Sequence, residues 1–325
     1  MKFRTEISPE KSGLRIGYNT PLFFTGSCFS EEIGSYLERG KFDILINPFG
    51  VLYNPASVSD SLGRIIEGRK FTEKDLFEYR DRFLSLSHDT SFSGESPEDV
   101  LKSINSNLEI AGTKLKNAYF LFVTFGTARV YRLKSSGRIV SNCHKIPAQE
   151  FKREVLSVDE IASLWKDLID KLREFNSRIN IVFTLSPVRH WKDGAHGNQI
   201  SKSILLLAID RLMSEDSRLK YFPSYELMID DLRDYRFYKD DLLHPSRAAV
   251  EYIWDYFAAT YFEEDVLNLY REIENVMAGV EHRFIGNNRH ETEAFKKNML
   301  SRISQINKLY PGIKLDSEQE YFSNL

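Results

Sequence analysis

Short apolar runs alternate along this chain with longer segments in which apolar residues recur every three or four positions. The first pattern is typical of strands buried on both faces, and the second is typical of amphipathic helices. The runs that predict strands are 21–27, 42–48, 118–126, 178–187 and a shorter one near 219–227. The segments that predict helices are 28–40, 56–68, 96–115, 157–176, 199–213 and 246–262. This alternation predicts a parallel β-sheet covered by helices on both faces.

Two of the predicted helices start at a serine. Ser96 stands directly before Pro97, and Ser157 is followed three residues later by Glu160. Proline suits the first position of a helix, and a serine with a glutamate three residues on forms a capping box. We therefore expect both serines to be N-caps.

The pattern changes twice along the chain. Residues 69–95 are mixed and rich in Ser, Asp and Arg, so we treat them as an insertion without an assigned structure. After residue 262 helical spacing continues, but no strand-like run follows. We therefore expect an α/β domain at 1–262 and a helical appendage at 263–325 that packs on the same domain.

Composition narrows the class of protein. Forty-four basic and 47 acidic residues give a net charge of −3 without a block of like charge, which argues against a nucleic-acid partner. The chain shows neither an apolar signal segment nor a run long enough to span a membrane. Cys28 and Cys143 form no metal-binding pattern, and a disulfide between them is the less favoured alternative. We expect a cytoplasmic protein without a membrane partner, and composition does not indicate its oligomeric state.

A serine stands at the corner where the first predicted strand meets the first predicted helix, in Gly26-Ser27-Cys28. Free N–H groups and the helix dipole favour a developing anion at such a corner. Serine becomes a nucleophile when a base and an orienting carboxylate are placed beside it. His244 and Asp241, three residues apart in DLLHPS (241–246), offer both. The sequence therefore predicts a Ser-His-Asp site.

Each member of this predicted site has an alternative interpretation. Ser27 could simply cap the helix that follows it, and 241–244 could be a surface turn. Asp240 competes with Asp241 as the orienting acid. Cys28 is a rival nucleophile, because a thiol beside a helix N-terminus has a depressed pKa. Successive residues at a turn point in different directions, so we expect Cys28 to be a buried packing residue.

Six segments resemble blocks of one protein family, in the expected order. They are FTGSCFSEEIG (24–34), NPFGVLYNPAS (47–57), TFGTARVY (124–131), NCHK (142–145), SPVRHWKDG (186–194) and DLLHPS (241–246). The chain thus resembles the GSCFA family, which is similar to the SGNH (GDSL-like) hydrolases. The resemblance implies a three-layer α/β/α sandwich with about five parallel strands, of SGNH or flavodoxin-like type. It also implies serine hydrolase chemistry on ester bonds.

The resemblance also implies roles for individual residues. Ser27 takes the position of the nucleophile, His244 that of the general base and Asp241 that of the orienting carboxylate. The N–H groups of Ser27 and Gly50 match two donors of the oxyanion hole.

The third oxyanion donor of SGNH enzymes, an asparagine, is missing from this chain, because its place reads Gly126-Thr127-Ala128-Arg129. The side chain of Asn54 and the hydroxyl of Thr127 are the candidates to replace it. Loss of one such donor typically lowers the rate by about 100-fold to 1,000-fold.

Several residues are candidates for substrate binding. Arg189 and His190 lie at a strand exit, where they either recognise an anionic or hydroxyl-rich substrate or belong to a solvated loop. His144 follows a predicted hairpin and either reaches the rim of the cleft or is a hydrogen-bonded interior histidine. Tyr235 and Tyr238 precede the Asp241 segment and are candidates to line the cleft.

The predicted Ser-His-Asp site and the family resemblance together favour a serine esterase. The resemblance alone implies that it removes short acyl groups such as acetyl, with a small-molecule or carbohydrate ester as substrate. The acyl group would pass through an acyl-enzyme, and neither a metal nor an organic cofactor is needed. An acyltransferase would use the same three residues. The other alternative is a non-catalytic module that binds an acylated or carbohydrate ligand, and the missing asparagine favours it.

Overall fold

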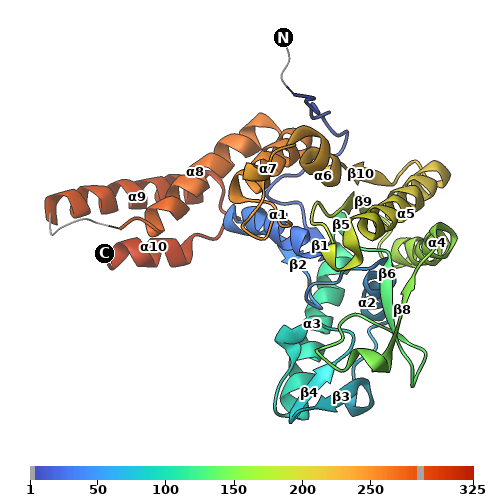
Figure 1. Cartoon of the computed structure of the whole chain (residues 1–325). Coiled ribbons are helices and arrows are strands. Elements are labelled where there is room, and N and C mark those ends of the chain that lie inside the picture. Colours follow the sequence, from blue (N-terminus) through green and yellow to red (C-terminus); the bar gives the residue numbers. More distant parts are fainter. Residues whose placement is uncertain (1–3, 284–288) are drawn as a thin grey trace. The chain divides into compact units, whose positions relative to one another are not determined.

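The computed structural model describes residues 4–283 and 289–325. Contacts divide the chain into two compact units. The first is built mainly from Pro21–Gly34 and Ile44–Ile253, and the second holds Ser8–Thr20, Ser35–Asp43 and Trp254–Leu325. Figure 1 labels the helices and strands of both units.

The first unit contains a five-stranded parallel sheet in the order β10-β9-β5-β1-β2. Its strands are β1 (Leu22–Gly26), β2 (Ile44–Ile46), β5 (Phe120–Phe125), β9 (Asn180–Leu185) and β10 (Lys220–Phe222). The predicted sheet of about five parallel strands is therefore confirmed. Numbered along the chain, these strands have the order 2-1-3-4-5, which is that of flavodoxin-like folds.

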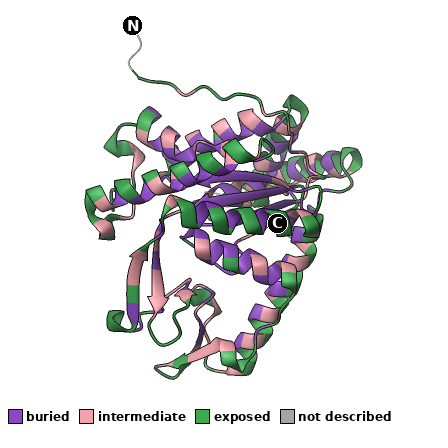
Figure 2. Cartoon of the chain, turned by 90° about the vertical axis from the view of Figure 1, so that its right-hand side faces the viewer, coloured by how far each residue is buried: buried purple, intermediate pink, exposed green. Residues whose placement is uncertain are grey.

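Helices cover both faces of this sheet, as Figure 2 shows for the buried strands between them. They are α1 (Cys28–Arg39), α2 (Pro55–Glu67), α3 (Pro97–Asn117), α4 (Val158–Phe175), α5 (Gly194–Glu215), α6 (Ser224–Glu226) and α7 (Arg247–Tyr261). Ser96 accepts a hydrogen bond from Asp99 N, and Ser157 and Glu160 form a capping box. Both predicted N-caps are confirmed.

One face of the sheet carries the largest apolar cluster of this unit. Phe23, Val123 and Phe183 alternate with residues of the other face and are fully buried. Trp165 of α4 packs edge-on against Phe183, with ring centroids 5.2 Å apart. Burying each such side chain stabilises the folded state by about 1.5–3 kcal/mol. A shift of one strand against its neighbours would expose these side chains, so their burial fixes the register of the strands and the positions of their ends.

Two small antiparallel structures extend the unit. The first is the hairpin of β3 (Leu76–Tyr79) and β4 (Arg82–Ser85), which supplies the structure that sequence left unassigned at 69–95. The second is a three-stranded sheet of β6 (Arg129–Leu133), β7 (Ile139–Val140) and β8 (Phe151–Val155). Its β6–β7 pair is the hairpin predicted before 142–145, whereas β8 was not predicted.

The second unit contains α8 (Glu264–Val280), α9 (Arg289–Leu309) and α10 (Asp316–Ser323) around a cluster that includes Ile273 and Ile303. Among the described residues after 262 there is no strand, as expected. The contact division falls within α1 and α7, so the boundary at 262 stays a prediction. Phe42, from an early segment of the chain, packs against Phe262 with ring centroids 5.2 Å apart.

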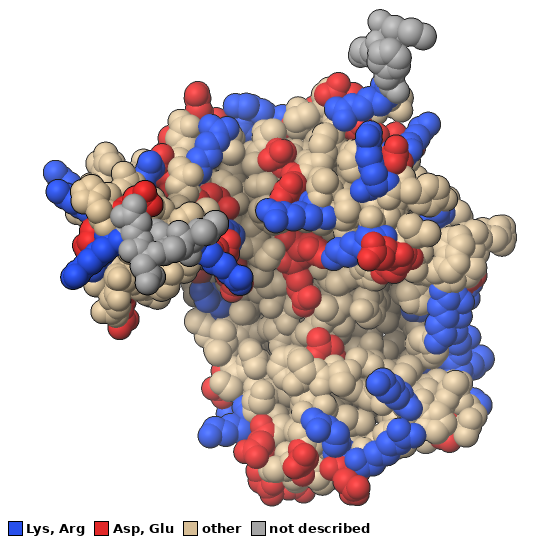
Figure 3. All heavy atoms as spheres, turned by 60° about the vertical axis from the view of Figure 1, so that its left-hand side comes forward, with Lys and Arg blue, Asp and Glu red and all other residues tan. Residues whose placement is uncertain are grey.

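Within residues 4–283 and 289–325, every helix is too short or too polar to cross a membrane. On the face drawn in Figure 3, Lys and Arg are interspersed with Asp and Glu. This face offers no extended surface of a single charge.

Candidate active site

The exits of three neighbouring strands meet at one edge of the sheet. Because β1, β5 and β9 are parallel, their carboxyl ends share an edge. Ser27 N donates to Thr124 O at 3.1 Å, and Ser186 N donates to Phe125 O at 2.8 Å. The sheet pairing thus continues one residue beyond β1 and β9 and fixes the polar residues that follow.

Ser27 occupies the corner between β1 and α1. It is 1% exposed, and its Oγ accepts a hydrogen bond from Phe29 N at 3.3 Å. The helix-capping role considered for this serine is therefore present in the structure. A capping hydroxyl accepts through its lone pair and keeps its proton, so the same oxygen can still give that proton to a base.

Gly26 allows this corner to form. Its φ is +130°, and a Cβ built there would lie 2.1 Å from Thr124 O. Its N–H donates to Asn47 Oδ1 at 2.9 Å, and Asn47 Nδ2 donates to Glu31 Oε1 at 3.1 Å. Asn47 therefore holds the corner from the end of β2. Sequence reasoning missed this residue, because the predicted strand 42–48 contained it, whereas β2 ends at Ile46.

Replacing Gly26 with alanine is expected to destabilise the protein by about 2–6 kcal/mol. This range adds about 1–3 kcal/mol of backbone strain to about 1–3 kcal/mol for the clash with the β5 backbone. Urea unfolding followed by circular dichroism measures the change.

Gly137→Ala is the matched control for this substitution. Gly137 has a φ of +70°, but a Cβ there meets no atom within 4 Å. It should cost only about 1–2 kcal/mol. Equal losses in both variants would contradict the steric explanation for Gly26.

Asp241 and His244 form a hydrogen-bonded pair in the loop that precedes α7. Asp241 Oδ2 lies 2.5 Å from His244 Nδ1, and Asp241 Oδ1 accepts from the backbone N–H groups of Leu243 and His244 at 2.9 Å each. These bonds lower the pKa of Asp241 to about 2. The ionised carboxylate favours a proton on Nδ1 and leaves Nε2 free to accept one. Among the described residues Asp240 makes no hydrogen bond to His244, so the geometry favours Asp241.

Ser27 and His244 are not hydrogen-bonded to each other in the part of the chain that the structure describes. The loop that carries the pair is tied to α1 by an ion pair of 3.1 Å between Lys239 Nζ and Glu32 Oε1. Glu32 lies within the first two turns of the helix that Ser27 caps. The loop is thus anchored beside α1, and the complete triad stays a prediction.

The two predicted oxyanion donors of the backbone already have acceptors. Ser27 N–H donates to Thr124 O, as described above, and Gly50 N–H donates to Asn47 O at 2.7 Å. Gly50 has a φ of +75°, and a Cβ there would lie 2.1 Å from the carboxyl carbon of Asp89. Gly50 is therefore required by a tight turn against Asp89, and its N–H must leave that turn to serve an oxyanion.

The two side chains proposed to replace the missing asparagine are engaged as well. Asn54 caps α2, because its Oδ1 accepts from Ser57 N at 2.8 Å and its Nδ2 donates to Ser57 Oγ at 3.0 Å. Thr127 Oγ1 lies 3.0 Å from Ser201 Oγ and accepts from Arg129 N at 3.1 Å. Their roles as oxyanion donors stay predictions, and a local rearrangement would be needed for each.

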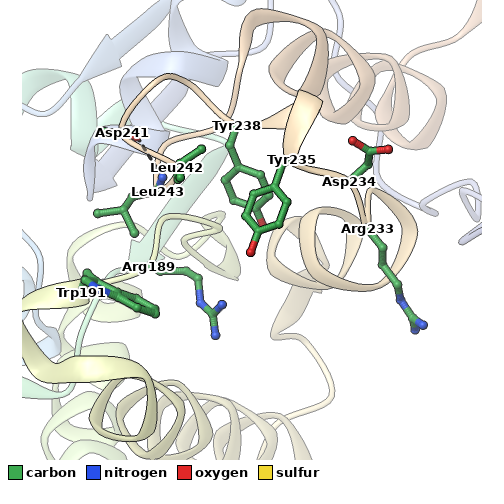
Figure 4. A pocket seen from close by; sticks show the side chains of 9 residues that line it. All are labelled: Arg189, Trp191, Arg233, Asp234, Tyr235, Tyr238, Asp241, Leu242 and Leu243. Atoms are coloured by element: carbon green, nitrogen blue, oxygen red, sulfur yellow. Dashed lines mark hydrogen bonds between the residues drawn. The ribbon is translucent and has the colours of Figure 1, made fainter.

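The three basic candidates for substrate binding lie in different surroundings. Arg189 lines a cavity of about 420 Å³ beside Asp241, as Figure 4 shows. His190 Nδ1 instead lies 2.9 Å from Asp193 Oδ2. His144 is 8% exposed, and its Nε2 lies 2.9 Å from Ser85 O. Arg189 is thus the member of this set that reaches the cavity.

Asp193 was not recognised from the sequence, although it organises the basic loop. Its side chain is fully buried, forms an ion pair with Arg129 Nε at 3.1 Å and pairs with Arg153 and His190. Burial and the nearby Arg153 lower the pKa of His190. The Asp193 carboxylate therefore balances the positive charge of the arginines that contact it. Arg189 takes no part in these ion pairs.

Lys202 of α5 joins the exits of β5 and β9. It is 2% exposed, and its Nζ donates to Gly126 O at 2.9 Å and to Ser186 O at 2.7 Å. Burial lowers the pKa of Lys202 to about 7. Sequence reasoning assigned this lysine no role; the structure shows that it ties two strand exits together.

Lys202→Met is expected to destabilise the protein and to change how stability depends on pH. Two buried carbonyls lose their donor, at a cost of about 1–3 kcal/mol each. In the wild type, between pH 7 and about 10.4, the unfolded chain binds one more proton at this lysine than the folded chain does. Stability therefore rises with pH in that window, by about 1.4 kcal/mol per pH unit.

Urea unfolding at neutral and at alkaline pH measures this dependence. The methionine variant should lose the rise that Lys202 contributes, whereas Lys102→Met, at an exposed position, should keep it. An identical pH dependence in the wild type and in Lys202→Met would contradict the assignment.

Cys28 is half-buried, and burial with the nearby Glu32 and Glu31 raises its pKa. The thiol is therefore protonated at neutral pH and is a weak rival to Ser27 as nucleophile. Cys28 and Cys143 are both free cysteines. Among the described residues no group of three or more His, Cys, Asp or Glu side chains could hold a metal ion.

Comparisons with known proteins give one sequence match. The sequence model of the GSCFA family matches residues 21–257. No curated protein matches the chain.

Similar solved structures include three carbohydrate-active esterases. A carbohydrate esterase family 3 protein from Talaromyces cellulolyticus is 8% identical and covers 78% of this chain and 99% of its own, with a TM-score of 0.35. A family 3 carbohydrate esterase from Clostridium thermocellum is 11% identical, covers 78% and 98%, and has a TM-score of 0.35. An acetyl xylan esterase from Butyrivibrio proteoclasticus is 11% identical, covers 74% and 64%, and has a TM-score of 0.38. Likeness at this level carries no argument about activity.

Proposed function

Because this chain belongs to the GSCFA family, we propose that it is a serine esterase that removes short acyl groups such as acetyl. One observation carries the proposal: Asp241 Oδ2 lies 2.5 Å from His244 Nδ1. The Asp241 carboxylate is itself fixed by hydrogen bonds from two backbone N–H groups. An imidazole held in this way through Nδ1 is ready to act as a general base through Nε2. Ser27, at the corner beneath α1, is the nucleophile of this proposal.

The reaction would proceed in two steps. Ser27 Oγ attacks the ester carbonyl carbon while His244 Nε2 takes the hydroxyl proton, and the alcohol leaves with that proton. Water then attacks the acyl carbon while His244 Nε2 takes one of its protons. His244 returns this proton to Ser27 Oγ as the bond to the acyl group breaks and the acid leaves. These residues supply all the acid-base chemistry, so the reaction needs no organic cofactor.

The first step requires His244 to come within hydrogen-bond distance of Ser27. The loop that carries His244 is anchored by the ion pair of Lys239 and Glu32, whose side chains are 51% and 36% exposed. Exposed pairs of this kind contribute only about 0–1 kcal/mol. This ion pair by itself therefore opposes movement of the loop only weakly.

A fluorophosphonate probe tests the proposal directly. The expected result is one adduct, located on Ser27 by mass spectrometry, that is absent from Ser27→Ala and His244→Ala. Cys28→Ala, a change at the same corner, should still be labelled. An adduct on another residue would overturn the assignment of the nucleophile.

A second candidate, a non-catalytic module that binds an acylated or carbohydrate ligand, is favoured by one observation. The N–H groups of Ser27 and Gly50 already donate to Thr124 O and Asn47 O. If these bonds persist with a ligand bound, no oxyanion hole forms. Absence of labelling from mildly acidic to mildly basic pH, together with retained ligand binding, would favour this candidate.

A further inference from the structure

The cavity beside the Asp241–His244 pair has two walls. Arg189 and Trp191 follow β9 and form one wall, and Tyr235, Tyr238 and the 241–243 loop form the other (Figure 4). Its aromatic side chains are unusually exposed: Trp191 is 50% and Tyr235 is 76% exposed. Exposed apolar surface beside a candidate active site is typical of a place that a ligand covers.

Arg189 brings an unpaired positive charge to this cavity. Among the described residues it forms no ion pair, and its one side-chain hydrogen bond is the long contact of 3.4 Å from Nη2 to Gln199 Oε1. Its Nε is buried without an acceptor. In contrast, Arg233 at the same cavity pairs with Asp230 at 3.4 Å.

The chemistry of an unpaired guanidinium defines the group that it would bind. Arginine presents parallel N–H donors that match the two oxygens of a carboxylate, and such charge-assisted bonds are about twice as strong as neutral ones. No carboxylate of the described chain fills this position. A carboxylate on the ligand would accept hydrogen bonds from the terminal N–H groups of this guanidinium.

The aromatic walls define the neighbouring part of the ligand. The Arg189 guanidinium carbon lies 5.7 Å from the centre of the Trp191 ring, so a group bound to this arginine lies close to the indole. Tyr235 and Tyr238 lie next to each other, with ring centroids 6.2 Å apart and ring planes tilted by 49°. Rings of this kind stack on planar or pyranose rings and cover them from water.

We propose that this cavity binds the alcohol part of the ester, and that this part is a ring that carries a carboxylate. The inference rests on the proposed function and extends it to a substrate class. Acylated uronic acids and acylated hydroxybenzoates share this chemistry. In either, Arg189 would hold the carboxylate and Trp191 the ring, while the ester faces His244.

Binding to Ser27→Ala, which cannot cleave the ester, tests this inference by calorimetry. The aromatic arm compares 4-acetoxybenzoate with its neutral methyl ester. The sugar arm compares a methyl O-acetyl-glucuronoside with the corresponding neutral glucoside. Since a hydrogen bond to a charged group contributes about 1.5–3 kcal/mol, the acid should bind about 10-fold to 150-fold more tightly in at least one arm. The arm with the larger ratio identifies the ring.

Variants of arginine assign the preference to one residue. In the Ser27→Ala background, Arg189→Gln should reduce the preference to below about threefold, and Arg189→Lys should keep part of it. The matched control is Arg218→Gln, which removes an exposed arginine that pairs with Asp216 outside the cavity. Arg218→Gln should keep the full preference.

Three results would overturn the inference: equal binding of acid and neutral partner in both arms, a preference that survives Arg189→Gln, or no binding of either acid. Failure of the proposed function gives a different result. In that case the fluorophosphonate leaves Ser27 unlabelled, while the acid preference and its dependence on Arg189 remain.

Discussion

Replacing Ser27 with alanine is expected to lower kcat for a short acyl ester by at least about 10,000-fold. Loss of the nucleophile in a Ser-His-Asp site removes the covalent route, and only residual catalysis by binding and electrostatics remains. Hydrolysis of 4-nitrophenyl acetate, followed by release of the coloured phenol, measures the effect. Because Ser27 also caps α1, its loss should in addition cost about 1 kcal/mol of stability.

Ser30→Ala is the matched control. Ser30 is buried in the first turn of the same helix, where its hydroxyl donates to Thr124 Oγ1 at 2.7 Å. The substitution should cost stability but retain turnover. If Ser27→Ala kept more than about a tenth of the wild-type rate, the nucleophile would lie elsewhere.

Asp241→Asn is expected to lower kcat by about 10,000-fold at neutral pH while leaving the loop in place. The amide oxygen can still accept the two backbone N–H bonds, but its NH₂ group then faces His244 Nδ1. The ring must turn to the tautomer that carries its proton on Nε2, where it can no longer accept a proton from Ser27. The same 4-nitrophenyl acetate assay measures this effect.

The pH dependence adds a further test of Asp241. Its folded pKa of about 2 lies below the usual unfolded value, so its stabilising contribution is present above that value and is lost only as pH falls towards 2. Protonation of Asp241 therefore should not limit activity at mildly acidic pH. Asp240→Asn is the control for Asp241→Asn. An equal loss of kcat in these two variants would contradict the assignment of Asp241 as the orienting carboxylate.

The main sheet could be predicted from the sequence because its strands are buried on both faces. The runs that became β1, β5 and β9 are almost wholly apolar, and the serine N-caps marked α3 and α4 clearly. The strand β8 reads Phe-Lys-Arg-Glu-Val and packs only one side against the protein. The sequence did not predict this strand because three of its five residues are charged, and a partly exposed strand lacks the continuous apolar run of a buried one.

The candidate site was predictable in its local parts. Asp241 and His244 are three residues apart, so their side chains can meet within one local turn of the chain. The partner of Gly50 and the arginines that surround Asp193 were not predictable, because both depend on contacts that the fold creates. Asp89 meets Gly50 from 39 positions further on in the chain, and Asp193 is buried by arginines of β6 and β8. A single sequence does not record such pairings.

The strand order has a consequence for synthesis of the chain on the ribosome. The strand β1 is made early, but its neighbour β5 follows only at Phe120–Phe125 and the strand beyond, β9, only at Asn180–Leu185. Its other neighbour, β2, follows soon after β1, but at the usual speed of about 5–20 residues per second the serine corner waits for several seconds without β5. The apolar strand that leads to Ser27 then lacks its β5 neighbour, and a nascent chain halted before β5 would be an expected substrate for chaperones.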